Sequence, residues 1–223
     1  MNETPAIPPN TPPTPAQHAA DLERRFGGVR RLYGAEALSR FQQAHVAVVG
    51  IGGVGSWAVE ALARSAIGHL TLIDLDMVAE SNVNRQIHAL GDVFGQAKTT
   101  AMAERVRAIN PACAVNEIED FVTPENVREM LGGGFDYVID AIDQVRTKVA
   151  MIAWCVAHDL PIVTAGGAGG QMEPTRILVD DLARTIQDPL LSKVRAKLRK
   201  EHGFSRDPKK KFGVDCVFSP EQI

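Results

Sequence analysis

Short apolar runs alternate along the chain with longer stretches in which apolar residues recur every three or four positions. The short runs predict buried strands and the longer stretches predict helices, because these spacings match the side-chain geometry of the two elements. We expect strands near residues 45–49, 70–74, 114–118, 136–140 and 161–164, and helices near 56–65, 96–109, 124–131 and 145–157. This alternation predicts an α/β fold of the Rossmann-like type, with a doubly wound, mostly parallel sheet covered by helices on both faces.

Further elements are expected on both sides of this core. The pattern predicts, in chain order, a helix over 21–26, a turn at Gly27-Gly28, a helix over 35–44, and then, after the core, a strand over 176–179, a charged helix over 189–202 and a strand over 213–219. A buried strand at a chain terminus usually leads into further structure, and the strand expected over 213–219 lies close to the end of this chain. We therefore expect the C-terminal part of this domain to be truncated.

The first fifteen residues contain six of the thirteen prolines, mixed with Thr, Asn and Ala. Such a composition cannot bury enough apolar surface to offset the entropy lost on ordering. We expect a disordered tail over residues 1–16 and a single domain over 17–223, a length that can bury a substantial core.

Composition and charge exclude several classes of protein. No apolar run is long enough to cross a membrane or to form a signal peptide, so we expect a cytoplasmic protein without membrane contact. The formal net charge of -3 argues against a protein that is basic over its whole surface, while a local basic patch remains compatible with it. Cys113, Cys155 and Cys216 form no CxxC pair, which argues against a disulfide framework and a structural zinc site. We expect all three to be reduced core residues.

The strongest chemical signal is a glycine-rich turn after the first core strand. Gly50, Gly52 and Gly55 match the GxGxxG pattern, and Gly53 lies within the same turn. Glycines let the backbone turn sharply into a helix and approach a phosphate closely, and the first amides of that helix attract an anion. Asp74 ends the next strand, at the spacing where an acid accepts hydrogen bonds from a ribose. Together these features predict nucleotide binding.

These residues alone fit two kinds of nucleotide-binding enzyme. A dinucleotide oxidoreductase binds NAD with the same strand, turn and ribose acid. An ATP-using enzyme places phosphates on the same turn. The glycine turn and Asp74 do not decide between them.

Motifs elsewhere in the chain, between about Arg25 and Ser219, resemble those of one family. They are Arg25-Phe-Gly-Gly, Asn84-Arg-Gln-Ile-His-Ala, Asp140-Ala-Ile-Asp-Gln-Val-Arg, Gly166-Gly-Ala-Gly-Gly-Gln, Thr185-Ile-Gln-Asp-Pro-Leu and Gly213-Val-Asp-Cys-Val-Phe-Ser. The family is that of the adenylating enzymes related to ubiquitin activation, which includes the sulfur-carrier adenylyltransferases of the molybdopterin and thiamine pathways. The motifs closely resemble its branch that uses ATP to dehydrate threonylcarbamoyladenosine, a modified adenosine next to the anticodon of tRNA.

The resemblance implies ATP and Mg²⁺ as cofactors and assigns roles to five residues. It matches Arg85 and Lys98 to the cations that contact the phosphates, and Asp143 to the acid that holds magnesium. It matches Asp74 to the ribose ligand and Asn82 to a nearby polar contact. Arg85, Lys98 and Asp143 are thereby the implied catalytic residues, which favours ATP over NAD.

The resemblance also implies a substrate and partners. The substrate is expected to be tRNA that carries threonylcarbamoyladenosine, and the enzyme is expected to be a homodimer. Arg25, Arg30 and Arg31 lie near the segment that supplies an arginine to the neighbouring subunit in relatives. One alternative is activation of the C-terminus of a ubiquitin-like sulfur-carrier protein, disfavoured by the lack of CxxC pairs. A third hypothesis, from a different class, is a nucleotide-binding scaffold without turnover.

Two further segments are each open to two interpretations. Gly166–Gly170 follows an expected strand and either lines the substrate cleft or forms a plain turn. The basic residues Lys209–Lys211, Arg195, Lys197, Arg199 and Lys200 either contact tRNA phosphates or form a solvated face. No aromatic residue lies within Arg195–Lys200 or within Lys209–Lys211 to stack on bases.

Overall fold

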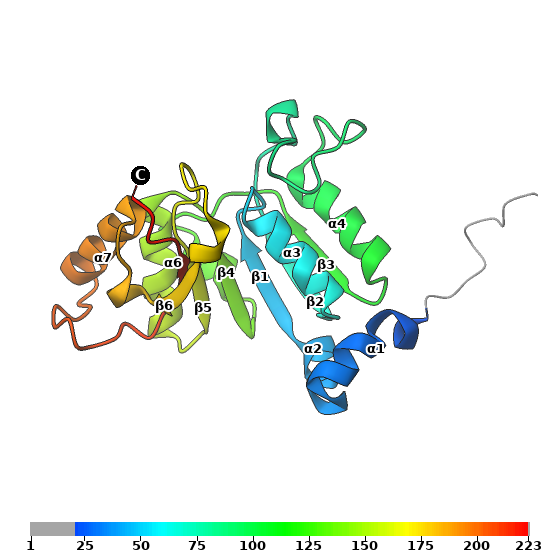
Figure 1. The fold of residues 1–223 in the computed structure, drawn as a ribbon, viewed down its shortest axis with the longest axis horizontal. Coiled ribbons are helices and arrows are strands. Elements are labelled where there is room, and N and C mark those ends of the chain that lie inside the picture. Colours follow the sequence, from blue (N-terminus) through cyan, green and yellow to red (C-terminus); the bar gives the residue numbers. More distant parts are fainter. Residues whose placement is uncertain (1–20, 223) are drawn as a thin grey trace, which may run out of the picture.

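The computed structural model describes residues 21–222, so the tail predicted over residues 1–16 lies outside the described part of the chain. One seven-stranded sheet runs through the molecule in the order β3-β2-β1-β4-β5-β7-β6 (Figure 1). Its strands are β1 (His45–Val49), β2 (His69–Ile73), β3 (Ala114–Ile118), β4 (Tyr137–Asp140), β5 (Ile162–Ala165), β6 (Leu178–Asp181) and β7 (Asp215–Phe218). All neighbouring strands are parallel except the β6–β7 pair. The predicted doubly wound α/β fold is confirmed.

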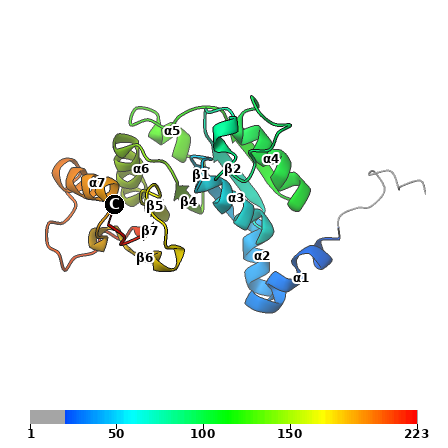
Figure 2. The ribbon, with the colours of Figure 1, turned by 45° about the horizontal axis from the view of Figure 1, so that its top comes forward.

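Helices cover both faces of the sheet, because alternate residues of each buried strand point to opposite sides. Val46 and Val48 of β1 pack with α3 (Gly55–Arg64) and α4 (Lys98–Ile109). Ala47 and Val49 belong to the other core, with α5 (Val127–Leu131), α6 (Val145–Ala157) and α7 (Pro189–Glu201). Figure 2 shows the two helix layers on either side of the strands.

The predicted turn at Gly27-Gly28 is wrong, because α1 (Leu22–Tyr33) runs straight through both glycines. Asp21 caps its start by accepting a hydrogen bond from the Arg24 amide at 3.0 Å. Phe26 then packs against Leu38 of α2 (Ala35–Gln43). A glycine inside a helix costs about 0.5–1 kcal/mol relative to alanine, and this packing offsets that cost.

The other predicted elements are present, with boundaries shifted by a few residues. The strand predicted over 176–179 is β6, which begins two residues later because a short 3₁₀ turn, Pro174–Arg176, precedes it. The strand predicted over 213–219 is β7, which inserts between β5 and β6. Two further 3₁₀ turns are Glu80–Asn82 and Leu182–Arg184.

One expectation about chemistry is also met within residues 21–222. The three cysteines are free and buried. Among these described residues, none of the helices combines the length and the apolar character needed to cross a bilayer.

Candidate functional site

The sheet places the predicted nucleotide turn at its topological switch point. β1 lies between β2 and β4, and the chain continues from β1 to one side of the sheet and from β4 to the other. Ligands of doubly wound sheets bind in the crevice at the carboxyl ends of such strands. Gly50 follows β1, and Asp143 follows β4, so both predicted site residues lie at this crevice.

The glycine turn is built on close backbone contacts. Gly50 has a φ of +87°, and a Cβ at this position would lie 2.8 Å from Ile142 Cγ2. A Cβ on Gly55 would lie 1.8 Å from the Gly50 carbonyl oxygen. Gly52 faces open space, and a Cβ on Gly53 would lie 3.3 Å from Arg85 Cγ. Gly50 and Gly55 therefore shape the turn, and Gly52 leaves room beside it.

Asp74 is buried and holds the glycine turn directly. Its Oδ2 accepts a hydrogen bond from the Ile51 amide at 2.6 Å, and its Oδ1 accepts one from the Asp76 amide at 2.8 Å. A carboxylate oxygen accepts about two hydrogen bonds, so each oxygen retains capacity for a ribose hydroxyl. The bond to Ile51 is a structural role that the ribose prediction did not include.

Arg85 lies against the glycine turn, with its methylene groups next to Gly53. Its Nη1 donates to the Ser81 carbonyl at 2.8 Å and to Asn84 Oδ1 at 2.9 Å. The remaining guanidinium N–H groups can point toward a phosphate on the turn. Asn82 is buried, and its Oδ1 accepts from the Ala79 amide at 3.0 Å, so that oxygen supports the 3₁₀ turn that carries the segment.

Lys98 is the first residue of α4, and it is buried. Its Nζ pairs with Asp76 Oδ2 at 2.7 Å, and its backbone amide donates to the Asp76 carbonyl at 3.0 Å. Asp76 thus links Lys98 to the Asp74 end of β2, a connection that the sequence motif did not reveal. The only hint was a second carboxylate two residues after Asp74.

Several buried polar atoms near these residues have no hydrogen-bond partner within residues 21–222. They are Ser56 Oγ, Gln86 Oε1, Thr99 Oγ1 and both ring nitrogens of His88. Ser56 lies in the first turn of α3 and Thr99 in the first turn of α4. Burial, followed by the positive charges of Lys98 and Arg105, lowers the pKa of His88 to about 4. Unsatisfied buried groups are rare, and a group of them at two helix starts is typical of a site completed by a ligand or water.

Asp143 is exposed and lies in the turn that follows β4. The preceding residues, Ala141 and Ile142, contact Gly50, so the structure brings the Asp143 turn and the glycine turn together. In the described part of the chain, no hydrogen bond or ion pair joins Asp143 to Arg85 or Lys98. Residues 21–222 also contain no group of three or more side chains that could together hold a metal ion.

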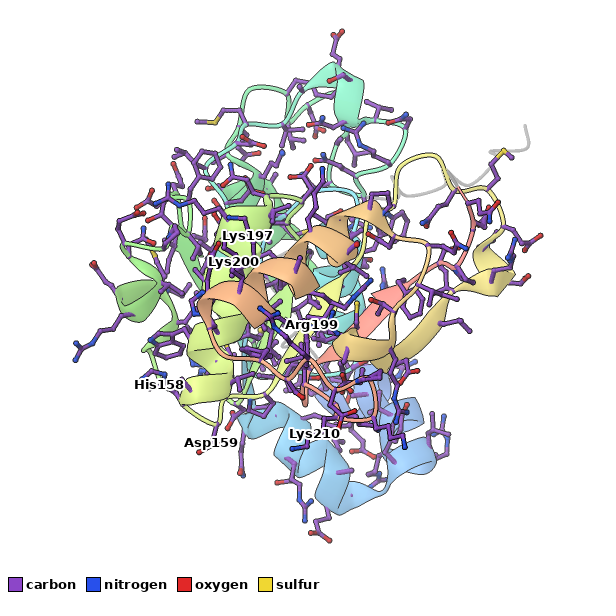
Figure 3. The ribbon with its side chains drawn as sticks, turned by 90° about the vertical axis from the view of Figure 1, so that its left-hand side faces the viewer. His158, Asp159, Lys197, Arg199, Lys200 and Lys210 are labelled. Atoms are coloured by element: carbon purple, nitrogen blue, oxygen red, sulfur yellow. The ribbon has the colours of Figure 1, made fainter. Side chains whose placement is uncertain are left out.

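A second surface lies along α7 (Figure 3), where Lys197, Arg199 and Lys200 lie on the helix and Lys210 on the loop that follows. Between Lys193 and Lys211 the chain has nine basic and two acidic residues, against a net charge of -3 for the whole chain. Arg195 donates to Thr185 Oγ1, and Arg199 donates to the Ser205 carbonyl at 3.2 Å. These two arginines are committed to internal contacts, unlike the exposed lysines.

A groove of about 390 Å³ runs beside this surface, between α5, α6 and α7. Trp154 and His158 stack on each other there, with ring centroids 4.2 Å apart, and Lys197 and His202 line the same groove. The sequence showed no aromatic residues within Arg195–Lys200 or within Lys209–Lys211. The structure supplies them from α6, which the spacing along α7 could not reveal.

Cys216 of β7 is buried close to charged groups. Burial, together with the charges of Asp188 and Asp140, raises the pKa of its thiol to about 12, against the opposing effect of Lys148 and Arg195. The thiol is therefore protonated at neutral pH, which fits the structural role expected for it.

Comparisons with known proteins agree with this geometry. Residues 26–201 match the ThiF family. A tRNA threonylcarbamoyladenosine dehydratase of Haemophilus influenzae is 56% identical over 203 residues, which are 91% of this chain and 78% of that protein. A protein of the same name from Escherichia coli is 58% identical over 200 residues, which are 90% of this chain and 75% of that protein. A crystal structure of Escherichia coli tRNA N6-threonylcarbamoyladenosine dehydratase in complex with ATP matches with a TM-score of 0.89 and 57% identity, covering 92% of this chain and 84% of that one.

Proposed function

The chain belongs to the ThiF family, and from this premise we propose that it is an ATP-dependent tRNA threonylcarbamoyladenosine dehydratase. The observation that carries the proposal is the identity of 56–58% with two proteins of that name, over at least three quarters of each. The site supports it independently, because a glycine turn, a ribose acid and two cations meet at one sheet edge.

The proposed chemistry begins with activation of the carboxylate on the threonylcarbamoyl side chain. The carboxylate oxygen attacks the α-phosphate of ATP, the bond to the β-phosphate oxygen breaks, and pyrophosphate leaves. A nitrogen of the side chain's own urea group then attacks the activated carbonyl, loses its proton and expels AMP. The ring closes with net loss of one water from the nucleoside. Intramolecular closure is entropically cheap, with effective molarities of about 10⁵ M or more in well-oriented cases.

The chain's residues would position the nucleotide and balance its charge. Asp74 receives the ribose hydroxyls while it holds Ile51. Phosphates lie over Gly52, where the turn is open, close to the N-terminus of α3. Arg85 and Lys98 neutralise the charge that develops as pyrophosphate leaves, which is the main requirement of this reaction type. Asn82 supports the segment that carries Arg85.

We further propose that Mg²⁺ binds at Asp143. Mg²⁺ prefers oxygen ligands and commonly takes one carboxylate together with substrate phosphates and water. Asp143 is an exposed carboxylate at the crevice, and the two residues before it lie against Gly50, so it fits a shared site of this kind. When bound, the metal would neutralise phosphate charge next to the glycine turn.

We propose that the basic surface of α7 and the following loop contacts the tRNA. Phosphate contacts need cations that are free to reach outward, which favours Lys193, Lys200 and Lys209–Lys211 over Arg195 and Arg199. The adjacent groove adds the Trp154 and His158 rings, which are suited to contact an unstacked base. Because its substrate is tRNA, we expect the protein in the cytoplasm.

A homodimer is proposed on the basis of an exposed apolar strip at the β6 edge. Within residues 21–222, β6 has a neighbouring strand on one side only, and five apolar side chains in or near it are between 46% and 90% exposed. They are Met172, Ile177, Leu178, Val179 and Ile186. Exposed apolar edges are usually covered by a partner. Arg25 donates to the Ala108 and Ile109 carbonyls at 2.8 and 2.6 Å, and Arg30 pairs with Glu23 at 2.7 Å, so two of the three candidate arginines are engaged within their own subunit.

The decisive experiment is mass spectrometry of tRNA nucleosides after incubation of threonylcarbamoyladenosine-containing tRNA with the protein, ATP and Mg²⁺. We expect an ATP-dependent loss of one water from the modified nucleoside, and no loss without ATP or with Lys98→Ala. Pyrophosphate release that requires a Gly-Gly-ended carrier protein instead of tRNA would favour the sulfur-carrier alternative. ATP binding without turnover on either substrate would favour the scaffold.

A further inference from the structure

A row of buried polar side chains crosses the sheet just below the nucleotide edge. Asp140 of β4 pairs in register with Thr164 of β5, and Thr164 pairs with Cys216 of β7. All three residues have no exposed surface. Two residues earlier on the same strands, Val138 and Ile162 belong to the apolar core. The polar row is thus the last layer of the core before the crevice.

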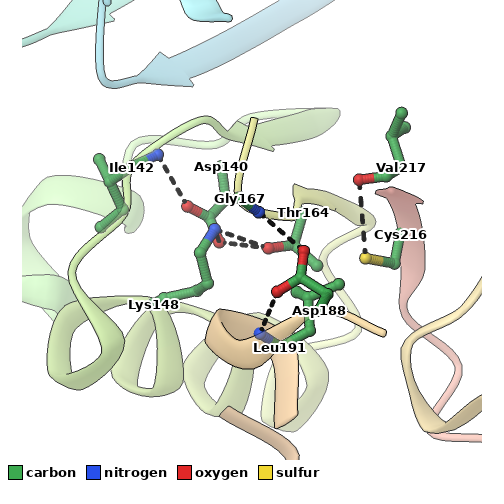
Figure 4. A network of polar contacts seen from close by, with 9 residues as sticks. All are labelled: Asp140, Ile142, Lys148, Thr164, Gly167, Asp188, Leu191, Cys216 and Val217. Atoms are coloured by element: carbon green, nitrogen blue, oxygen red, sulfur yellow. Dashed lines mark hydrogen bonds and ion pairs between the residues drawn. The ribbon is translucent and has the colours of Figure 1, made fainter. Parts of the chain in front are cut away.

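Lys148 reaches this row from the N-terminal part of α6 and is also fully buried. Its Nζ donates to Asp140 Oδ2 at 2.7 Å and to Thr164 Oγ1 at 2.9 Å, and the Thr164 hydroxyl donates to the same Asp140 oxygen at 2.6 Å (Figure 4). The three side chains form a closed ring of polar contacts. None of the sequence motifs pointed to Lys148.

Stability alone does not account for this cluster. A buried ion pair roughly recovers its own desolvation penalty, and apolar residues of similar volume are often as stabilising or more so. What buried pairs can provide instead is a fixed arrangement of the segments that carry them.

The first segment that the cluster fixes carries Asp143. This residue lies between Asp140 and Lys148, so the ion pair ties the two ends of its turn together. The Ile142 amide also donates to Asp140 Oδ1 at 3.3 Å, and the Ala141 amide donates to the Val49 carbonyl at 2.9 Å. The turn is in this way held against Gly50.

The second segment is the Gly166–Gly170 loop, which follows Thr164 on β5. Asp188 holds it to the start of α7, because Oδ2 accepts from the Gly167 amide and Oδ1 from the Leu191 amide, both at 2.8 Å (Figure 4). A Cβ on Gly166 would lie 2.3 Å from Asp188 Oδ2, so glycine is required for this contact.

We propose that Lys148 is a positioning residue of the adenylation site: by pairing with Asp140 and Thr164 it holds the Asp143 turn and the Gly166–Gly170 loop in a fixed relation. The inference rests on the proposed function, in which Mg²⁺ binds at Asp143 beside the ATP phosphates, and on the interpretation in which the Gly166–Gly170 loop lines the substrate cleft. Misplacement by about 1 Å can lower a reaction rate about 100-fold.

The test compares variants that remove the contacts while keeping side-chain volume. Thr164→Val removes one hydroxyl, and Thr164→Ser restores it. Lys148→Met combined with Asp140→Asn removes both buried charges at once, so no unpaired charge remains. Thr71→Val is the matched control, since Thr71 is equally buried in β2 but its hydroxyl contacts His45, 2.9 Å away. Each protein is measured for thermal unfolding, ATP affinity, kcat and KM for ATP with modified tRNA, and amide hydrogen exchange.

We expect kcat to fall about 10-fold in Thr164→Val and about 100-fold in the double variant, with KM for ATP changed less than about twofold. Thr164→Ser should recover most of the rate, and Thr71→Val should keep it. A folded Thr164→Val variant with unchanged kcat would overturn the proposal. If the double variant does not fold, the kcat of Thr164→Val is by itself sufficient to test the proposal.

Hydrogen exchange separates this proposal from the proposed function. If the wild-type protein does not act on tRNA, the proposed function fails, yet positioning still predicts faster exchange over 141–143 and 166–170 in Thr164→Val than in Thr71→Val. Equal exchange in the two variants would contradict the positioning role whatever the substrate.

Discussion

At the scale of single residues, the proposed adenylation depends on three charged side chains that lie outside the apolar clusters of the core. Asp143 is exposed, Arg85 lies on the surface of the glycine turn, and the partner of Lys98, Asp76, keeps 57% of its side chain exposed. We expect Arg85→Ala, Lys98→Ala and Asp143→Ala each to lower AMP transfer at least about 100-fold, because each removes charge stabilisation in the transition state. Circular dichroism should show folded proteins. Unchanged turnover in all three would mean that the site is assigned wrongly.

A second prediction at this scale concerns His88, whose pKa is lowered from 6.5 to about 4 by burial and by Lys98 and Arg105. The unfolded chain binds this proton more readily than the folded one, so protonation favours unfolding. The contribution of neutral His88 to stability is complete above pH 6.5 and is lost as the pH falls toward 4, by at most about 3 kcal/mol.

His88→Leu should therefore flatten the fall in the free energy of unfolding between pH 6.5 and 4.5, measured by urea denaturation. Parallel curves for wild type and His88→Leu would show that His88 titrates normally in the folded protein.

At the scale of elements, the glycines inside α1 lead to a prediction about the free energy of unfolding. Gly28 lies inside the helix, and among the described residues a Cβ at this position would meet only Arg31 Nη2, at 3.9 Å. Gly28→Ala should raise the free energy of unfolding by about 0.5–1 kcal/mol, because alanine loses less backbone entropy on folding. Chemical denaturation measures this. Gly55→Ala is the contrasting case, since its Cβ would overlap the Gly50 carbonyl, and we expect it to destabilise the protein.

The sheet and its main helices could be predicted from the sequence because buried parallel strands are nearly continuous apolar runs. β1 and α6, for example, begin and end at the predicted residues. The sequence predicted a break in α1 at its glycines, because helix propensity depends on neighbouring residues and contains no information on the packing of Phe26 against Leu38. In the candidate site, the sequence spacing suggested that Asp74 lies beside the glycine turn, where the structure has it. The Lys148 ring could not be predicted, since it joins residues from three separate elements. Contacts between residues far apart in the sequence produce no periodic pattern from which they could be predicted.

At the scale of the whole molecule, the exposed apolar edge predicts its quaternary state. Val179 of β6 is 68% exposed, so Val179→Lys should have little effect on the fold of one subunit. If β6 forms the homodimer interface, the lysine charge should shift the protein to monomers in analytical ultracentrifugation. Phe121 is 51% exposed elsewhere, and Phe121→Lys should leave the dimer intact. Identical sedimentation of both variants with the wild type would remove β6 from the interface.

The separation of charge over the molecule leads to the last prediction. A chain with a net charge of -3 repels RNA in general, so binding must concentrate where the nine basic residues between Lys193 and Lys211 lie. Replacing Lys209, Lys210 and Lys211 together with Glu should weaken tRNA binding more than about 10-fold at moderate salt. It should also reduce the slope of log affinity against log salt, by about 0.7–0.9 for each phosphate that the protein no longer neutralises. The same three residues changed to Arg keep the charge and should preserve both quantities, and ATP affinity should stay constant in all forms. Weaker binding without a change in slope would mean that the lysines act through the loop's structure, and unchanged binding would place the tRNA on another face.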